Sequence, residues 1–267
     1  MSTIIKYIIF IVIFISVILS YFFYTPLVNQ QIYSSISYIF TKQTGLDVDV
    51  ESINVQKYPY LEADMIVEEK YNLQLKGFFK NSRIDMDYTL TSNCLQSTIC
   101  TIDDEINITG QIEGLLSNVK VTGSGKALDG NVSYELLKSK DTFKDIDLVL
   151  NDMNSSKLFT LLGQTAFLDG KADAHIHFDM ISQEHKKGHL TYNVKKSDLS
   201  GVRVDLHTQI NIDDNNQTFI MDVTAPKLTL HLTQGEYDQE KNTAHAYYAL
   251  DIKELSHLEK LLGYKYV

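Results

Sequence analysis

The sequence predicts a mainly β protein in which an N-terminal transmembrane helix precedes an elongated, curved, mostly antiparallel β-sheet with a few short helices. An uncharged apolar segment opens the chain, and from Asp47 onward apolar and polar residues alternate with a period of two. The 267 residues include 16 Tyr and 12 Phe, which favour strands, and only 3 Pro. Because this alternation gives each strand one apolar and one polar face, it predicts about a dozen strands.

The N-terminal segment predicts a membrane anchor over residues 1–25. Residues 7–24, YIIFIVIFISVILSYFFY, carry no charge, and a helix of this length spans about 27 Å, close to the thickness of a bilayer core. A cleaved signal peptide is the alternative, but SYFFYTP offers no small-residue cleavage site. We therefore expect a single-pass inner-membrane protein. Lys6 before the span places the N-terminus in the cytoplasm and the bulk of the chain in the periplasm.

Residues 26–45 are predicted to form a separate amphipathic helix. It begins at Pro26 and ends at Gly45, which are typical boundary residues. Its apolar residues recur at helical spacing: Leu27, Val28, Ile32, Ile36, Ile39 and Phe40. We expect this helix to pack on the domain that follows, and a position at the membrane surface is the alternative.

The rest of the chain, residues 46–267, is predicted to be a periplasmic β domain with internal repeats. Linkers such as GSGKALDGN and DDNN are typical of turns. Two short helices are expected at 155–163 and 255–263, each ending at a glycine, and they match one another 100 residues apart. The match predicts repeat units at about 46–163 and 164–263. Residues 264–267 are then expected to open a further unit. The alternative for this end of the chain is that the last helix covers the edge of the sheet.

Composition excludes several classes of function. The net charge is −10 and no basic run occurs, which argues against nucleic-acid binding and against docking on anionic lipid by charge. GSGKA at 123–127 lacks the spacing of a phosphate-binding loop, and no nucleophile elbow is present. We expect no enzymatic activity and no cofactor.

Histidines are the most suggestive polar residues. Six of them fall on the polar faces of predicted strands, near Asp173 and Asp179: His175, His177, His189, His207, His231 and His245. A zinc site or a pH-sensitive surface is one interpretation. We favour the interpretation that they form a solvated polar face, because the histidines do not follow the spacing of a metal-ligand motif.

Cysteine and asparagine patterns fit an extracytoplasmic compartment. Cys94 and Cys100 flank LQSTI and are predicted to form a disulfide, with two unpaired thiols as the alternative. Four Asn-x-Ser/Thr sites each follow an acidic residue by two positions, a pattern that resembles the acceptor of bacterial periplasmic N-glycosylation; clustering of Asp and Asn in turns is the alternative. The sites are Asn107, Asn131, Asn154 and Asn216.

The apolar strand faces must be covered, and three short helices are too few to do so. The sheet must therefore form two packed layers or a curved trough that stays open. Because large exposed apolar surfaces are rare unless something binds them, the alternation by itself favours the closed sandwich.

Two stretches resemble the AsmA-like family of bacterial envelope proteins, to which TamB is related. The first is SYIFTKQTGLDVDVESINVQKYPYLEADMIVEE, with its uncharged helix, TG, a VDVESI strand and Pro59 in a turn. The second is FLDGKADAHIHFDM with KGHLTYNVKKSDLSGVRV, where residues 197–202 take the place of the family's Gly-marked strand. Family members are often much longer than this chain.

The resemblance implies a periplasmic β-groove that carries phospholipid acyl chains in envelope biogenesis, with other envelope proteins as further partners. A non-enzymatic structural or partner-binding module with a closed β-sandwich is the alternative. The residues expected to face lipid are Ile84, Met86, Tyr88, Ile176, Phe178, Met180, Leu190, Tyr192, Val204, Leu206, Leu228, Leu230 and Leu232.

Overall fold

A computed structural model describes most of the chain after residue 46. The described residues are 37–38, 41, 47–57, 59–94, 102–140, 142–164, 168–182, 184–199 and 202–254. The predicted anchor, most of the predicted helix at 26–45 and the predicted helix at 255–263 lie outside them. No helix in these ranges has the length and apolar character needed to cross a bilayer.

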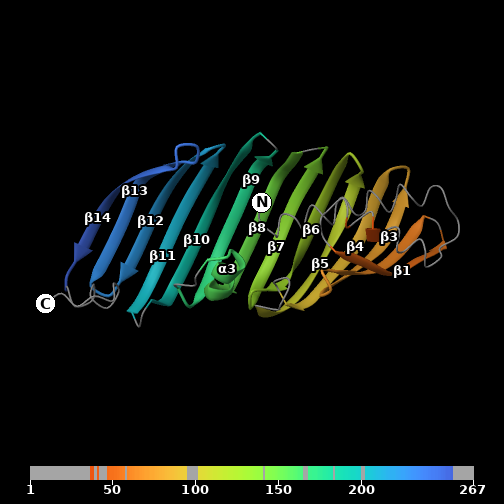
Figure 1. Cartoon of the computed structure of the whole chain (residues 1–267), viewed down its shortest axis with the longest axis horizontal. Coiled ribbons are helices and arrows are strands. Elements are labelled where there is room, and N and C mark those ends of the chain that lie inside the picture. Colours follow the sequence, from red (N-terminus) through yellow and green to blue (C-terminus); the bar gives the residue numbers. More distant parts are fainter. Residues whose placement is uncertain are drawn as a thin grey trace. The chain divides into compact units, whose positions relative to one another are not determined.

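The described strands form one antiparallel sheet in which the strand order follows the chain (Figure 1). This confirms the mainly β, antiparallel prediction, with fourteen strands in place of about a dozen. The strands are β1 (Val48–Lys57), β2 (Tyr60–Val67), β3 (Tyr71–Lys80), β4 (Arg83–Cys94), β5 (Asp103–Leu115), β6 (Asn118–Ala127), β7 (Gly130–Ser139), β8 (Thr142–Asn154), β9 (Lys171–Ile181), β10 (Lys186–Leu199), β11 (Val202–Asp213), β12 (Asn216–Ala225), β13 (Leu228–Asp238) and β14 (Thr243–Ile252).

The chain divides into two compact units. Unit 1 contains residues up to 127 together with 134–140, and unit 2 contains 128–133 together with the residues from 141 onward. Strand β7 thus begins in unit 2 and continues in unit 1.

Unit 1 buries its apolar face. Strands β2 and β3 alternate residue by residue between buried and more exposed side chains, as the period of two predicts. At the centre of the core, Ile84 and Ile112 are 0% exposed. Full burial of a large apolar side chain contributes about 1.5–3 kcal/mol, so burial of this face stabilises the unit.

Tyr88 fills the space above two glycines in neighbouring strands of unit 1. It lies opposite Gly110 of β5, which lies opposite Gly123 of β6, and a Cβ at either glycine would collide with the Tyr88 hydroxyl. The Tyr88 hydroxyl donates to the carbonyl of Thr122 (3.0 Å) and shares a short hydrogen bond with the Tyr134 hydroxyl. The segment GSGKA, expected to be turn, is therefore strand, because an aromatic ring covers the missing side chains.

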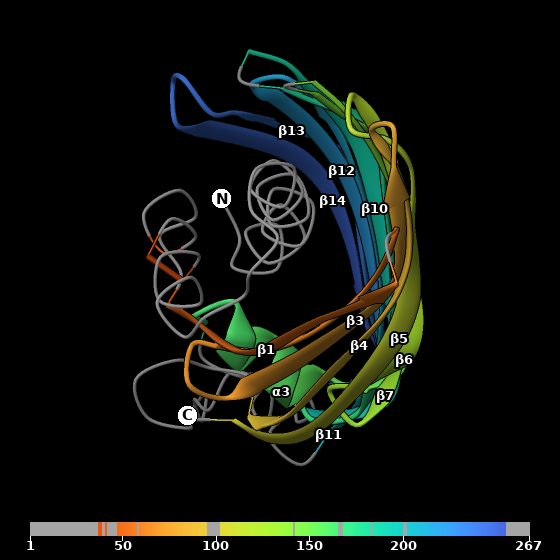
Figure 2. The ribbon, with the colours of Figure 1, turned by 90° about the vertical axis from the view of Figure 1, so that its right-hand side faces the viewer.

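Unit 2 contains the one helix that lies within a described connection between strands, α3 (Ser155–Leu161), between β8 and β9. Its N-cap is Asn154, whose side-chain oxygen accepts from the backbone N–H of Lys157 (3.2 Å), and the chain leaves it through Gly163 at φ +73°. This agrees with the helix predicted at 155–163. Strands β10 to β14 bend along their length, and α3 lies on the concave side (Figure 2).

Candidate functional site

A continuous apolar face runs across strands β8 to β14 of unit 2. Directly opposite residues in an antiparallel pair share a face, and the register places Leu190 of β10 opposite Ile176 of β9 and Ile210 of β11. We name this surface the unit 2 apolar face. Its members that are not fully buried include Ile146, Leu148, Ile176, Phe178, Leu190, Tyr192, Leu206, Ile210, Ile212, Phe219, Met221, Val223, Leu230, Leu232, Tyr248 and Leu250.

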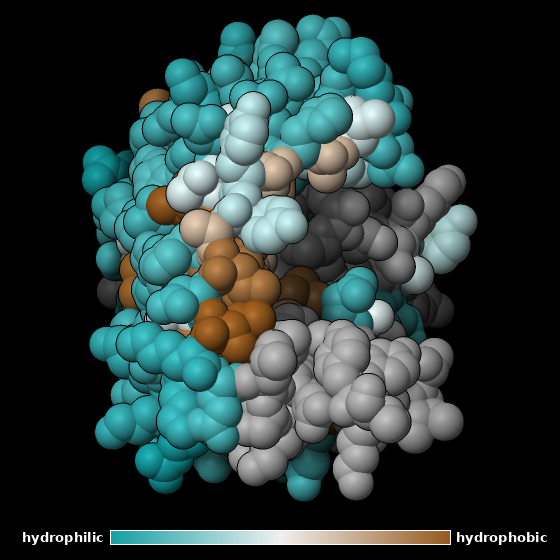
Figure 3. All heavy atoms as spheres, turned by 90° about the vertical axis from the view of Figure 1, so that its left-hand side faces the viewer, coloured by the Kyte–Doolittle hydropathy of each residue, from teal (hydrophilic) through white to brown (hydrophobic). Residues whose placement is uncertain are grey.

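Accessibility changes along the strands of this face. At the end of the strands next to α3 the apolar side chains are buried, including Met153, Ala172 and Val194. Farther along they are half-buried, and at the last strand they are exposed, with Tyr248 at 74% and Leu250 at 45%. Figure 3, which views the molecule from the side of β14, shows a hydrophobic patch with hydrophilic residues on its left. The face is thus buried at the end next to α3, half-buried farther along and exposed at β14.

Helix α3 packs against the buried end of the unit 2 apolar face. The ring of Phe159 meets the ring of Tyr192 edge to face, with 6.2 Å between their centres. The Tyr192 hydroxyl is buried and has no hydrogen-bond partner within the described residues. The nearby Ser155 hydroxyl donates instead to the carbonyl of Gly170 (3.0 Å). Burial raises the pKa of the Tyr192 phenol, and the neighbouring Ser155 side chain opposes this more weakly, so the phenol stays neutral.

Two aromatic rings lie over glycines on the unit 2 apolar face. Phe178 is opposite Gly188, and Phe219 is opposite Gly235; a Cβ at either glycine would collide with the ring. Both rings therefore extend across a neighbouring strand. This arrangement provides broad apolar surface with no polar group.

The residues predicted to face lipid separate into three groups. Ile84, Met86 and Tyr88 lie in the core of unit 1, and Val204 and Leu228 lie in the buried end of unit 2. Met180 is half-buried beside a register irregularity between β9 and β10. The structure brings the remaining seven together on the unit 2 apolar face: Ile176, Phe178, Leu190, Tyr192, Leu206, Leu230 and Leu232.

Strand β12 contributes residues to this face that the alternation of apolar and polar residues did not predict. Phe219, Met221 and Val223 face the same side as Ile210 and Leu206 of β11. The run Phe-Ile-Met hides the alternation, because Ile220 points to the opposite face, where it is 38% exposed. The signal that identifies them is the two-residue connection after Asp213, which sets the register of β11 with β12.

The predicted histidine cluster forms on the opposite face of unit 2. Asp147 Oδ2 is 3.0 Å from His175 Nε2 and 3.3 Å from His177 Nδ1, and the His177 and His189 rings are 5.1 Å apart. Burial acts to raise the pKa of Asp147, but its hydrogen bonds to the two histidines outweigh this and lower it. No group of three His, Cys, Asp or Glu that could hold a metal occurs in the part of the chain that the structure describes.

The other predicted histidines of this face are separate from the cluster. His207 Nδ1 makes a short hydrogen bond to Asn193, and His231 Nδ1 lies 2.6 Å from Asp222 Oδ1. His245 is exposed on β14, and Asp173 accepts a hydrogen bond from the backbone N–H of Asp152 (2.9 Å). These contacts are typical of a solvated polar face.

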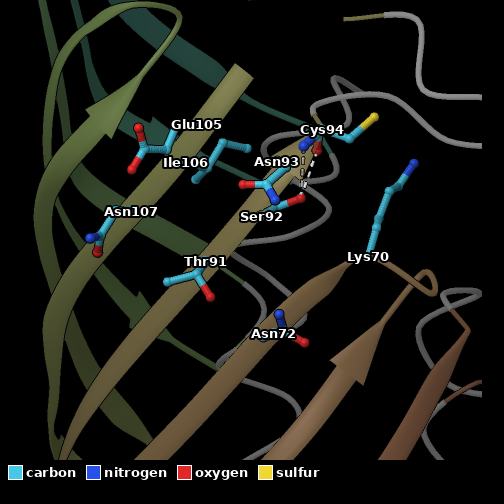
Figure 4. A pocket seen from close by; sticks show the side chains of 9 residues that line it. All are labelled: Lys70, Asn72, Thr91, Ser92, Asn93, Cys94, Glu105, Ile106 and Asn107. Carbon is cyan, nitrogen blue, oxygen red and sulfur yellow. Dashed lines mark hydrogen bonds between the residues drawn. The ribbon is translucent and has the colours of Figure 1, made fainter. Parts of the chain in front are cut away.

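A polar depression of about 390 Å³ lies over strands β3 to β5 in unit 1 (Figure 4). Its charged residues are Lys70 and Glu105, and the Ser92 hydroxyl donates to the Cys94 carbonyl (2.9 Å). Cys94 is 7% exposed and disulfide-bonded. Cys100 lies outside the described residues, so the predicted pairing stays a prediction.

The four asparagines of the predicted glycosylation sites differ in their surroundings. Asn107, which lines the depression of Figure 4, is exposed, as are Asn131 and Asn216. Asn154 is engaged as the N-cap of α3, and its amide nitrogen donates to Asp129 (3.3 Å). Modification at these sites stays a prediction, with Asn154 the least accessible.

Comparison of the chain with protein-family models, with curated proteins and with solved structures finds no match.

Proposed function

We propose that this chain binds phospholipid acyl chains along the unit 2 apolar face, as an AsmA-like protein anchored in the inner membrane and acting in envelope biogenesis. The observation that carries the proposal is the half-exposed apolar face that continues through seven strands, β8 to β14. Soluble domains rarely leave so many apolar side chains accessible in one place unless a ligand or partner covers them.

The energetics suit an acyl chain. Each methylene group removed from water contributes about 0.8 kcal/mol, so a chain of ten buried methylenes gains on the order of 8 kcal/mol before ordering costs. These contacts have no preferred direction. The broad rings of Phe178 and Phe219 and the aliphatic side chains between them therefore allow a chain to slide as well as to bind.

The packed end of the face gives the bound lipid an orientation. Hydrocarbon fits the open part, and the buried Tyr192 hydroxyl is a donor without a partner in the described structure. An ester carbonyl would satisfy this donor if α3 moved away from Tyr192, because the hydroxyl is buried beneath it and an unpaired buried hydroxyl is unfavourable.

The closed sandwich receives less support. Ile176, Phe178, Tyr192 and Leu206 would be fully buried beneath a second sheet, whereas they are half-buried. All strands that the structure describes belong to one sheet.

Photo-crosslinking with a matched pair of positions tests the proposal. A benzophenone amino acid replaces either Ile210 or its neighbour Gln209, which lie on opposite faces of β11. The full chain is irradiated in cells and analysed by mass spectrometry. We expect phospholipid adducts at position 210 and few at 209. Equal labelling at both positions, or no lipid at 210, would overturn the proposal.

A further inference from the structure

Strand β14 is an edge strand whose side chains are accessible along nearly its whole length. Nine of its ten residues are exposed, and Tyr247 and Tyr248 reach 71% and 74%. It pairs with β13 on one side, and no strand of the described chain pairs with its other side. Its outer backbone N–H and C=O groups can therefore accept another strand.

The edge lacks the features that normally prevent pairing. The sequence of β14 is TAHAYYALDI, in which the acidic and basic side chains are Asp251 and His245, and no Lys, Pro or Gly occurs. Strand β1, at the other end of the strand order, contains Asp49, Glu51 and Lys57 and has two register irregularities. Charges and bulges of this kind protect an edge. The pairing of β13 with β14 has one irregularity, an extra residue of β13 between Thr233 and Glu236, and the register is regular from Tyr247 to Ile252.

We propose that β14 pairs antiparallel with β14 of a second copy of the chain, about a two-fold axis through Tyr248. Opposite residues must share a face, so a symmetric antiparallel pair has to be centred on a residue and not between two residues. Centring on Tyr248 places His245 of each copy opposite Asp251 of the other. It also places Ala244 opposite Ile252 and Ala246 opposite Leu250, so each small residue meets a large one.

Neighbouring registers lack this complementarity. Centring on Tyr247 places His245 opposite Ala249 and Asp251 opposite Thr243. Centring on Ala249 places His245 opposite Lys253 and Tyr247 opposite Asp251. Cross-strand pairs of opposite charge and of matched size stabilise a sheet, so the strand is self-complementary in the Tyr248 register.

The dimer would extend the sheet without a break in its apolar face. A two-fold axis perpendicular to the sheet keeps Tyr248 and Leu250 of both copies on the same side, so the two unit 2 apolar faces become continuous. The inference does not rest on the proposed function, because it uses only the backbone and side chains of β14.

Cysteine crosslinking of the full chain in detergent tests the register. In the proposed pair, two Tyr248→Cys residues lie directly opposite each other, whereas two Tyr247→Cys residues are offset along the strands. We expect a disulfide-linked dimer for Tyr248→Cys and little for Tyr247→Cys, with the unsubstituted chain as background. Preferred crosslinking of Tyr247→Cys would overturn the proposal.

Charge reversal tests the pairing independently, by sedimentation velocity. His245→Asp places two carboxylates together on each side of the axis, so we expect dimerisation to weaken about tenfold. The double variant His245→Asp with Asp251→Lys restores opposite charges across the axis and should restore the dimer, although the local change beside Glu236 remains. A chain that stays monomeric at all concentrations, or a double variant as weak as the single one, would overturn the proposal.

Discussion

At the scale of single residues, aromatic rings above glycines determine where the sheet can be tightly packed. Tyr88, Phe178 and Phe219 each cover a glycine in the adjacent strand, and in each case a Cβ on the glycine would meet the ring. This pairing of an aromatic ring with a glycine occurs in two environments. Tyr88 is buried in unit 1, whereas the two Phe rings are half-buried in unit 2.

Gly123 provides a test of this packing. Gly123→Ala should lower the free energy of unfolding by about 1–3 kcal/mol, because the new methyl group displaces the Tyr88 and Tyr134 rings. Urea denaturation measures the loss. Ser124→Ala, at an exposed neighbouring position, should stay within about 0.5 kcal/mol. Adding Tyr88→Phe removes one of the colliding atoms, so the double variant should lose less than the sum of the single variants; strict additivity would contradict the packing argument.

At the scale of elements, a carboxylate joins two connections at the same end of the unit 2 strands. Asp214, in the turn between β11 and β12, has its Oδ2 3.0 Å from His185 Nδ1, before β10, and its Oδ1 accepts from the backbone N–H of Lys186 (2.9 Å). The hydrogen bond with Asp214 raises the pKa of His185, and the hydrogen bond with His185 lowers that of Asp214.

These directions predict how the contact depends on pH. The raised His185 pKa stabilises the fold below the usual value of 6.5, and this is lost as pH rises through the folded-state pKa. The lowered Asp214 pKa stabilises it above 3.8, and this is lost as pH falls through the folded-state pKa. The contact is therefore strongest between these two values. An NMR titration should place the His185 midpoint above 6.5, and Asp214→Asn should bring it back towards 6.5; an unchanged midpoint in the variant would contradict the pairing.

Elements with clean alternation could be predicted from the sequence, and those with an interrupted pattern could not. In β10, Leu190, Tyr192 and Val194 alternate with polar residues and identify their face directly. In β12 the apolar Ile220 between Phe219 and Met221 conceals the face, and only the pairing register reveals it. The glycines at 123 and 125 resembled turn residues because their covering side chain, Tyr88, lies far away in the sequence.

At the scale of the whole chain, the same sequence pattern leads to two different degrees of burial. Ile84 in unit 1 and Ile176 in unit 2 both belong to strands with one apolar and one polar face, yet Ile84 is 0% exposed and Ile176 is half-buried. A period of two specifies which face a residue is on, but not what covers that face. The sequence pattern could therefore predict residues of the unit 2 apolar face. For the same reason it also predicted that Ile84 and Met86 face lipid, although they are core residues of unit 1.

This difference in burial predicts unequal costs for the same kind of truncation. Met86→Ala removes a side chain that is 1% exposed and should lower the free energy of unfolding by about 2–5 kcal/mol, because it leaves a cavity. Leu230→Ala acts on a half-buried side chain and should cost only about 1 kcal/mol, since water can fill part of the space.

Hydrogen exchange in urea, followed by mass spectrometry of peptides from each unit, measures the loss in free energy of unfolding separately for each unit. Separate measurement is needed because a chain with two compact units does not have to unfold in one step. In the crosslinking experiment in cells, Leu230→Ala should also reduce lipid adducts at position 210, whereas Met86→Ala, which lies in the core of unit 1, should not. A loss at Leu230 as large as that at Met86 would mean that the unit 2 apolar face is packed as a core, and would remove the observation on which lipid binding is proposed.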